Sequence, residues 1–117
     1  MLEKSKKLAL KIAQILDDRK AIDVVVLDIH KLTIIADYFV IASGTSEIQV
    51  RALCDEVEDK LKQEGIEAIH KDGHGGNRWV ALDYGDVIVH IFHQDEREFY
   101  DLERLWADGI PLSVDNA

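Results

Sequence analysis

The stretch Trp79-Val-Ala-Leu-Asp-Tyr-Gly-Asp-Val-Ile-Val-His90 decides most of what this sequence predicts about the fold. Two apolar runs flank Tyr84-Gly85, and a glycine can take the positive φ that a tight turn demands. The stretch therefore predicts a β-hairpin. A helix with one apolar side is expected to follow it from about Asp95 to Trp106.

The two faces of this hairpin differ in composition. If Asp83 pairs with Asp86, Trp79 lies opposite His90, and side chains alternate between the faces along each strand. One face is then wholly aliphatic and is expected to be core: Val80, Leu82, Val87, Val89 and Ile91. The other mixes aromatic, acidic and imidazole groups: Trp79, Ala81, Asp83, Asp86, Ile88, His90 and Phe92. That mixture is typical of a contact surface, and the alternative is that its aromatic rings pack under a covering helix.

Length and charge limit the classes of function. A chain of 117 residues supports one compact domain. Its 14 basic residues stand against 23 acidic ones, which gives a formal net charge of −9. Nucleic-acid backbones attract clusters of Lys and Arg, so we expect no direct binding to nucleic acid. A basic protein partner suits this charge, although an acidic surface also serves solubility alone.

The sequence predicts a reduced, cytoplasmic setting. Cys54 is the single cysteine, so the chain has neither an internal disulfide nor a cysteine metal cluster. No apolar stretch approaches the roughly 20 residues of a membrane span, and we expect no membrane partner. The first residues lack the apolar core of a signal peptide and are expected to begin a helix instead.

The first part of the chain predicts a helix and two strands. Apolar residues recur at helical spacing over about residues 3–19, which predicts an amphipathic helix. Residues 21–29 are expected to form a strand that is too apolar for either of its faces to be exposed to solvent. Residues 38–42 are expected to form a second strand. The connection between these strands is expected to pack three side chains locally: Thr33, Ile34 and Ile35.

The second helix has clear boundaries. Ser46 with Gln49 three residues later forms a capping box, and Gly65 is a natural stop after a helix that reaches about Glu64. Its buried stripe is expected to contain Ile48, Leu53, Val57 and Leu61. A short strand over residues 66–69 and the hairpin complete the order. The order of elements predicts a single α/β domain with a mixed β-sheet flanked by helices.

Two patterns are compatible with catalysis, and in each a structural role is favoured. Thr45 and Ser46 follow Gly44 at a turn into a helix, where a phosphate can bind, but the P-loop lysine is missing and Ser46 is explained as a cap. Asp83 and Asp86 would have to converge on Mg²⁺ in a transferase. Two acids across a tight turn are usually turn formers. A nucleotide- or metal-dependent transferase is therefore only the second hypothesis.

The histidines and the cysteine do not indicate a metal site or a nucleophile. His90 and His93 point to opposite faces of a regular strand. His70 and His74 flank a loop in which no third ligand is obvious, and Cys54 lies in the middle of a helical pattern. We therefore expect no metal, no cofactor and no catalytic residue.

Three motifs occur in order along the chain. They are Asp37-Tyr-Phe-Val-Ile-Ala-Ser-Gly-Thr-Ser46 followed by Gln49, the hairpin from Trp79 to His90, and Arg97-Glu-Phe-Tyr-Asp-Leu-Glu-Arg-Leu-Trp106. Together they closely resemble the Iojap-like family, the ribosomal silencing factors, over about residues 5–106. The chain departs from the family pattern in the loop before the hairpin, where Asp72-Gly73 replaces the usual Glu-Gly. We place the family domain at residues 1–108 and a C-terminal tail at residues 109–117.

The resemblance implies a specific function. The family fold is similar to a catalytically inactive nucleotidyltransferase domain. Family members bind the large ribosomal subunit through a basic ribosomal protein at the subunit-joining face, the fourteenth large-subunit protein in the standard naming. They block the small subunit sterically and lower translation, typically under starvation. Homodimers and a role in late assembly of the large subunit are also implied.

The expected contact patch comes from the hairpin and the helix after it. Its members are Trp79, Asp83, Tyr84, Asp86, His90, Tyr100 and Glu103. Trp79 is expected to anchor the partner, and the carboxylates to pair with Arg or Lys of that partner. Trp106 is expected to clamp the end of the helix onto the core instead.

Overall fold

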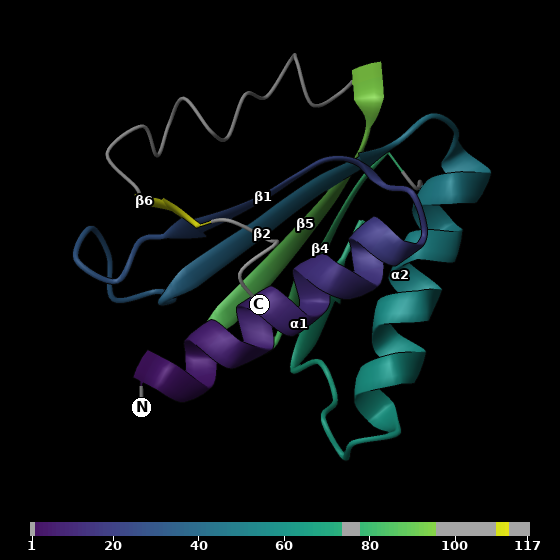
Figure 1. Cartoon of the computed structure of the whole chain (residues 1–117). Coiled ribbons are helices and arrows are strands. Elements are labelled where there is room, and N and C mark those ends of the chain that lie inside the picture. The colour runs from purple at the N-terminus through teal and green to yellow at the C-terminus, as the bar shows by residue number, and fades with distance from the viewer. Residues whose placement is uncertain (1, 74–77, 96–109, 113–117) are drawn as a thin grey trace.

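A computed structural model describes residues 2–73, 78–95 and 110–112 of the chain (Figure 1). Two helices and six strands occur in these ranges. In chain order they are α1 (Leu2–Asp18), β1 (Ile22–Asp28), β2 (Tyr38–Gly44), α2 (Glu47–Lys62), β3 (His70–Asp72), β4 (Trp79–Asp83), β5 (Val87–His93) and β6 (Ile110–Leu112). The predicted helix over residues 95–106 lies almost wholly outside the described residues.

The strands form one mixed sheet in the order β3-β4-β5-β2-β1-β6. β2 and β5 run parallel in the middle, from Tyr38 opposite Val87 to Gly44 opposite His93. The other neighbouring strands are antiparallel. The predicted α/β fold with a mixed sheet is confirmed. Residues 110–112, which we assigned to a C-terminal tail, pair with β1 as β6.

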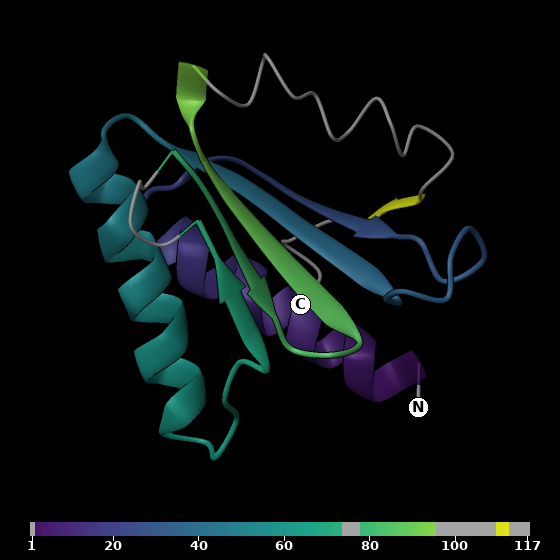
Figure 2. The ribbon, with the colours of Figure 1, turned by 180° about the vertical axis from the view of Figure 1, so that it is seen from behind.

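Both helices cover the same face of the sheet, as Figures 1 and 2 show from opposite sides. The main core lies between them and the sheet. Ile12 and Leu16 of α1 and Leu53 and Leu61 of α2 are at most 2% exposed there. The aliphatic face of the hairpin belongs to the same core, as the sequence predicts: Val80, Leu82, Val87, Val89 and Ile91 are each 0% exposed.

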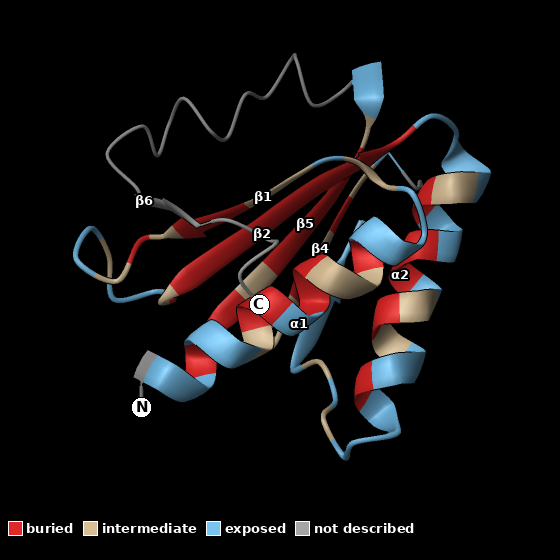
Figure 3. Cartoon of the chain, viewed as in Figure 1, coloured by how far each residue is buried: buried red, intermediate tan, exposed pale blue. Residues whose placement is uncertain are grey.

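The opposite face of the sheet carries a second, smaller apolar cluster. Its buried members are Leu27, Ile29, Ala36, Phe39, Ile41 and Phe92. Trp79 and Ile88 pack against this cluster and are only partly buried. All residues of β2 are buried, because it contributes side chains to both clusters (Figure 3).

The predicted register of the hairpin is wrong, because each residue of β4 pairs with a residue two positions further along β5 than predicted. Trp79 lies opposite Phe92 and not His90, and Asp83 lies opposite Ile88 and not Asp86. Gly85 has a φ of 89° and occupies the first of the two central positions of the turn. A type II′ turn requires glycine at this position. Because side chains alternate between the two faces, a shift of two residues leaves each side chain on its predicted face.

Three local predictions from the sequence are also wrong. The short strand expected at residues 66–69 lies at His70–Asp72. Ile48, expected in the buried stripe of α2, is 82% exposed. Ile34 and Ile35, expected to pack locally, are 104% and 65% exposed. For the three isoleucines, hydrophobicity alone suggested burial, although their side chains are exposed to solvent.

The start of α2 follows the predicted cap closely. The Ser46 hydroxyl accepts a hydrogen bond from the Gln49 backbone N–H at 3.0 Å. The Gln49 side chain reaches back one residue further than in a standard capping box, and its Oε1 accepts from the Thr45 N–H at 2.6 Å. After the helix, Gly65 adopts a φ of 77°, which fits the predicted stop. Neither α1 nor α2, the helices of the described residues, combines the length and the apolar character that a membrane span requires.

Replacing the cap should destabilise the domain. We expect Ser46→Ala to lower the free energy of unfolding by about 1 kcal/mol, because one N–H at the start of α2 loses its partner. Urea titration followed by circular dichroism measures this change. Arg51→Ala on the exposed side of the same helix removes only a 4.0 Å ion pair to Asp55 and is the control. A loss in Ser46→Ala no larger than in this control would contradict the capping role.

Candidate functional site

Trp79 and His90 are in direct contact, although they are not opposite each other in the sheet. The Trp79 indole Nε1–H donates a hydrogen bond to His90 Nδ1 at 3.1 Å. They reach one another diagonally, because β4 places Trp79 opposite Phe92 and His90 opposite Ala81. The predicted association of these two site residues is therefore present with a different geometry.

Phe39 and Phe92 complete an aromatic cluster around this pair. Trp79 stacks on Phe92 with ring centroids 5.0 Å apart and an interplanar angle of 23°. Phe39, from β2, meets His90 edge-on at 4.8 Å and 80°. Both arrangements are among those that aromatic rings favour. Trp79 is thus held in one orientation while part of its surface stays accessible.

Burial determines the protonation state of His90. The residue is 8% exposed, and this burial lowers the pKa of its imidazole from 6.5 to about 4. Because Nδ1 accepts from Trp79, the ring proton of the neutral form lies on Nε2. Nε2 is buried and has no hydrogen-bond partner among the described residues. His90 is therefore a neutral support for Trp79 at physiological pH.

Asp83 and Asp86 lie at the turn between β4 and β5. The Asp83 carboxylate accepts a hydrogen bond from the Gly85 backbone N–H at 2.7 Å, so it stabilises the turn. Asp86 is exposed, and its backbone carbonyl accepts from the N–H groups of Asp37 and Tyr38 at 2.8 and 3.1 Å. The backbone of Asp86 is therefore fixed while its carboxylate faces solvent.

Tyr84 lies on the other side of the sheet from Trp79. It packs against the main core beneath α2, beside a cavity of about 380 Å³ whose lining includes Glu58 and Lys71. Burial and the nearby Glu58 raise the pKa of the Tyr84 hydroxyl to about 12. The structure therefore does not bring Tyr84 to the face that carries Trp79 and His90. Tyr100 and Glu103, the other predicted patch residues, lie outside the described residues.

The patterns weighed as catalytic have structural roles where they are described. Ser46 is engaged as a helix cap and Asp83 as a turn former. Cys54 is fully buried, and this burial raises the pKa of its thiol to about 12, so the reactive thiolate is suppressed. Within residues 2–73, 78–95 and 110–112, no three His, Cys, Asp or Glu residues are grouped to hold a metal ion.

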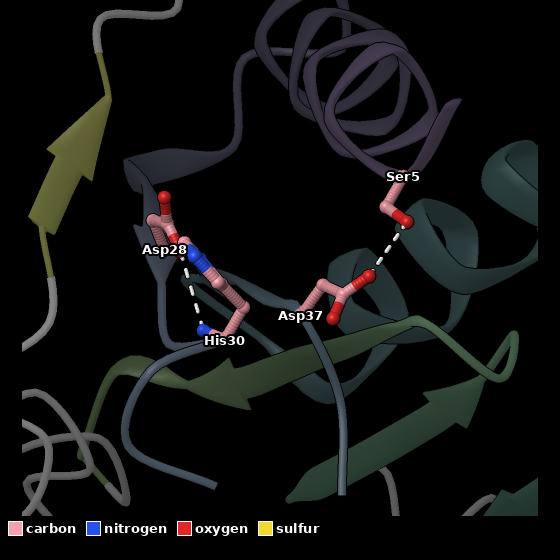
Figure 4. Close-up of polar contacts among 4 residues, drawn as sticks. All are labelled: Ser5, Asp28, His30 and Asp37. Carbon is pink, nitrogen blue, oxygen red and sulfur yellow. Dashed lines mark hydrogen bonds and ion pairs between the residues drawn. The ribbon is translucent and has the colours of Figure 1, made fainter. Parts of the chain in front are cut away.

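The loop between β1 and β2 is tied to its surroundings by two carboxylates (Figure 4). The Ser5 hydroxyl of α1 donates to Asp37 Oδ2 at 2.8 Å, and Ser5 is buried. At the other end of the loop, the Asp28 carboxylate contacts the ring and the backbone N–H of His30. The Asp37 end of this loop lies next to the turn that carries Asp86, because the Asp86 carbonyl accepts from the N–H groups of Asp37 and Tyr38.

Comparison with known proteins identifies the family. Residues 2–116 match the family model described as ribosomal silencing factor during starvation. The chain belongs to the ribosomal silencing factors. It is 44% identical over 99 residues to the ribosomal silencing factor of Bacillus subtilis, a match that covers 85% of this chain and 84% of the relative. It is 46% identical over 99 residues to that of Halalkalibacterium halodurans, with 85% of each covered.

A solved member of similar structure supports the fold. A crystal structure of a protein from Chromobacterium violaceum matches with a TM-score of 0.81 and 37% sequence identity. The match covers 92% of this chain and 87% of the solved one. The family resemblance predicted from the three sequence motifs is confirmed, and the described fold is that of ribosomal silencing factors.

Two features of this region were not predicted from the sequence. Phe39 was not assigned to the aromatic cluster, although strand alternation places it with Ile41 on one face of β2. The exposure of Leu32, Ile34 and Ile35 was also missed. Their position in a non-periodic segment between two strand patterns was a signal, because loop side chains usually lie on the surface.

The burial of His90 predicts a specific dependence of stability on pH. Its pKa is about 4 in the folded state and 6.5 in the unfolded state, so between these values the unfolded chain binds more protons. The His90 contribution is complete above pH 6.5 and is lost as the pH falls toward 4, by roughly 3 kcal/mol. Urea unfolding at several pH values measures this slope.

Two variants isolate the contribution of His90. His90→Phe should show a shallower loss of stability between pH 6.5 and 4 than the parent. His70→Gln replaces an exposed histidine and is the matched control for the loss of a histidine. Equal slopes for His90→Phe and the parent would contradict the neutral, buried state of His90.

Proposed function

We propose that this silencing factor binds the large ribosomal subunit through a basic ribosomal protein at the subunit-joining face, the fourteenth large-subunit protein in the standard naming. While bound there it excludes the small subunit by volume and represses translation. The observation that carries the proposal is the family match over residues 2–116. Among its relatives, the Bacillus subtilis protein is itself named a ribosomal silencing factor.

The charge of the chain supports a basic partner. A net charge of −9 on 117 residues attracts a surface rich in Lys and Arg and repels the phosphate backbone of ribosomal RNA. Recognition of ribosomal RNA as the main contact would need a basic patch. A basic ribosomal protein attracts the acidic chain electrostatically, and it holds the bound chain at a fixed position on the subunit.

The proposed mechanism is steric and non-enzymatic. A domain whose sheet is buried on both faces does not deform easily, and it keeps its volume where the small subunit has to approach. The turn former Asp83 and the buried thiol of Cys54 are unsuited to catalysis, which agrees with inhibition by occupancy. We place this action in the cytoplasm. Homodimer formation and a role in late large-subunit assembly remain predictions from the family.

Within the proposed contact patch, the residues have different roles. Trp79 offers a partly accessible aromatic surface that the stack on Phe92 and the bond to His90 keep oriented. A preoriented tryptophan loses little conformational entropy on binding. His90 then acts as a positioning residue, and Asp86 offers an exposed carboxylate at the turn that precedes β5. Tyr100 and Glu103 belong to the proposal on the strength of the sequence alone.

Truncation of Trp79 tests the patch. We expect Trp79→Ala to weaken binding to isolated large subunits by about 2 kcal/mol, roughly 30-fold, because an interface tryptophan commonly contributes that much. Co-sedimentation with separated large subunits, small subunits and joined ribosomes measures binding, and light scattering measures subunit joining. Trp79→Phe keeps a ring stacked on Phe92 and should lose less. Parental binding by a folded Trp79→Ala variant would exclude Trp79 from the interface.

Charge reversal at the turn tests the electrostatic part. Asp86→Lys should weaken the complex several-fold at low salt, and the difference from the parent should shrink as salt rises. Asp17→Lys makes the same change in net charge on the exposed end of α1 and serves as the matched control. If both variants weaken binding equally, net charge and not the turn attracts the partner.

A further inference from the structure

One end of the sheet gathers most of the exposed large apolar side chains. Among the described residues, five such side chains are exposed, and three of them lie in the loop between β1 and β2. They are Leu32, Ile34 and Ile35, with exposed fractions of 43%, 104% and 65%. Figure 3 shows this loop extending from the sheet as a largely exposed segment. A fully exposed Ile34 buries nothing in the folded chain and therefore adds nothing to its core.

A fourth side chain, Ile69, lies at the same end of the sheet. It is 64% exposed, and its backbone N–H donates to the Asp83 carbonyl at 2.7 Å. A side chain built on Gly85 would lie 3.4 Å from Cδ1 of Ile69, so Ile69 flanks the turn. The fifth residue, Ile48, follows the far end of β2 at the start of α2.

The pairing of the strands brings the loop to this turn. β2 and β5 run parallel and begin together, with Tyr38 opposite Val87. Figure 2 shows the connection between β1 and β2 entering β2 near the turn between β4 and β5, with its bend projecting beyond the end of the sheet. The Asp86 carbonyl, which accepts from Asp37 and Tyr38, joins the two segments directly. From β3, which Ile69 precedes, to β1 is four strand spacings, about 19 Å, which a single protein partner covers.

The loop has an internally bonded backbone that supports these side chains. The Ile29 carbonyl accepts from the N–H groups of Leu32 and Thr33 at 2.9 and 3.2 Å. The Thr33 hydroxyl accepts from the Ile35 N–H at 3.1 Å. With its ends held by Asp28 and by Asp37, as Figure 4 shows, the loop presents apolar side chains from a bonded frame. Such a frame reduces the entropic cost of binding.

We propose that this end of the sheet, made of Leu32, Ile34, Ile35, Ile69 and Asp86, docks onto the basic ribosomal protein, with the isoleucines as apolar anchors. The assignment rests on the proposed function and extends its contact patch from the hairpin to the loop. A central apolar group with charged groups at its side is the usual composition of a protein interface. The partner therefore carries an apolar depression bordered by Lys or Arg.

Charge favours a basic protein over other occupants. Asp86, in the turn, is exposed and attracts a basic partner, whereas Lys31, in the loop between β1 and β2, is exposed and carries the opposite charge. The whole chain carries a net charge of −9, which opposes docking onto an anionic membrane or an RNA backbone. A second copy of the chain would bring the same negative charge. The basic protein is the occupant for which apolar burial and charge act together.

The experiment compares two variants of the full chain. Ile34→Ser with Ile35→Ser removes the two most exposed anchors of the loop, and Ile48→Ser removes an 82% exposed isoleucine at the other end of the sheet. Neither change touches the core, so both proteins should unfold at the parental urea concentration. Binding to isolated large subunits is measured by co-sedimentation at two salt concentrations. Sedimentation velocity of the free proteins gives their oligomeric state.

We expect the double variant to bind large subunits at least about tenfold more weakly at both salt concentrations, and Ile48→Ser to bind like the parent. Parental binding by the double variant overturns this assignment and leaves the proposed function intact. A change in oligomeric state with unchanged binding assigns the surface to a second copy and also overturns it. If the parent itself does not bind large subunits, the proposed function fails, and this assignment fails with it.

Discussion

The parallel pairing of β2 with β5 is the constraint on which the rest of the structure depends. These two strands lie in the middle of the sheet, and seven pairs of residues, from Tyr38–Val87 to Gly44–His93, join them. The pairing joins the hairpin of the second half of the chain to the antiparallel β1–β2 pair of the first half. Parallel strands need cover on both faces, and β2 accordingly contributes to both apolar clusters.

The same pairing determines what meets at each end of the sheet. Because both strands begin at one end, the loop before β2 and the turn before β5 are neighbours, joined by hydrogen bonds to the Asp86 carbonyl. Exposed apolar residues of the loop and an exposed acidic residue of the turn thereby lie at the same end of the sheet. The Trp79–His90 contact belongs to the face of the sheet opposite the helices. The proposed interface thus includes one end and one face of the same sheet.

Much of the fold was predictable because it follows from local periodicity. The apolar spacing in α1, the Ser46 cap of α2, and the aliphatic face of the hairpin all appear in the structure as expected. The errors occur where local pattern is insufficient. The hairpin register depends on whether Gly85 occupies the first or the second central position of the turn, and both positions suit the flanking apolar runs. Ile48 and Ile34 show that an apolar residue type does not establish burial.

The sequence by itself determined the α/β class, the family, the aliphatic core face and the acidic character of the chain, because periodicity, motif order and charge are properties of the chain alone. Only the tertiary structure decided that His90 is buried beside Trp79, that Tyr84 points to the side of α2, and that the β1–β2 loop meets the hairpin turn. These relations depend on contacts between residues far apart in sequence. Such contacts are established by strand pairing and packing, which no local pattern specifies.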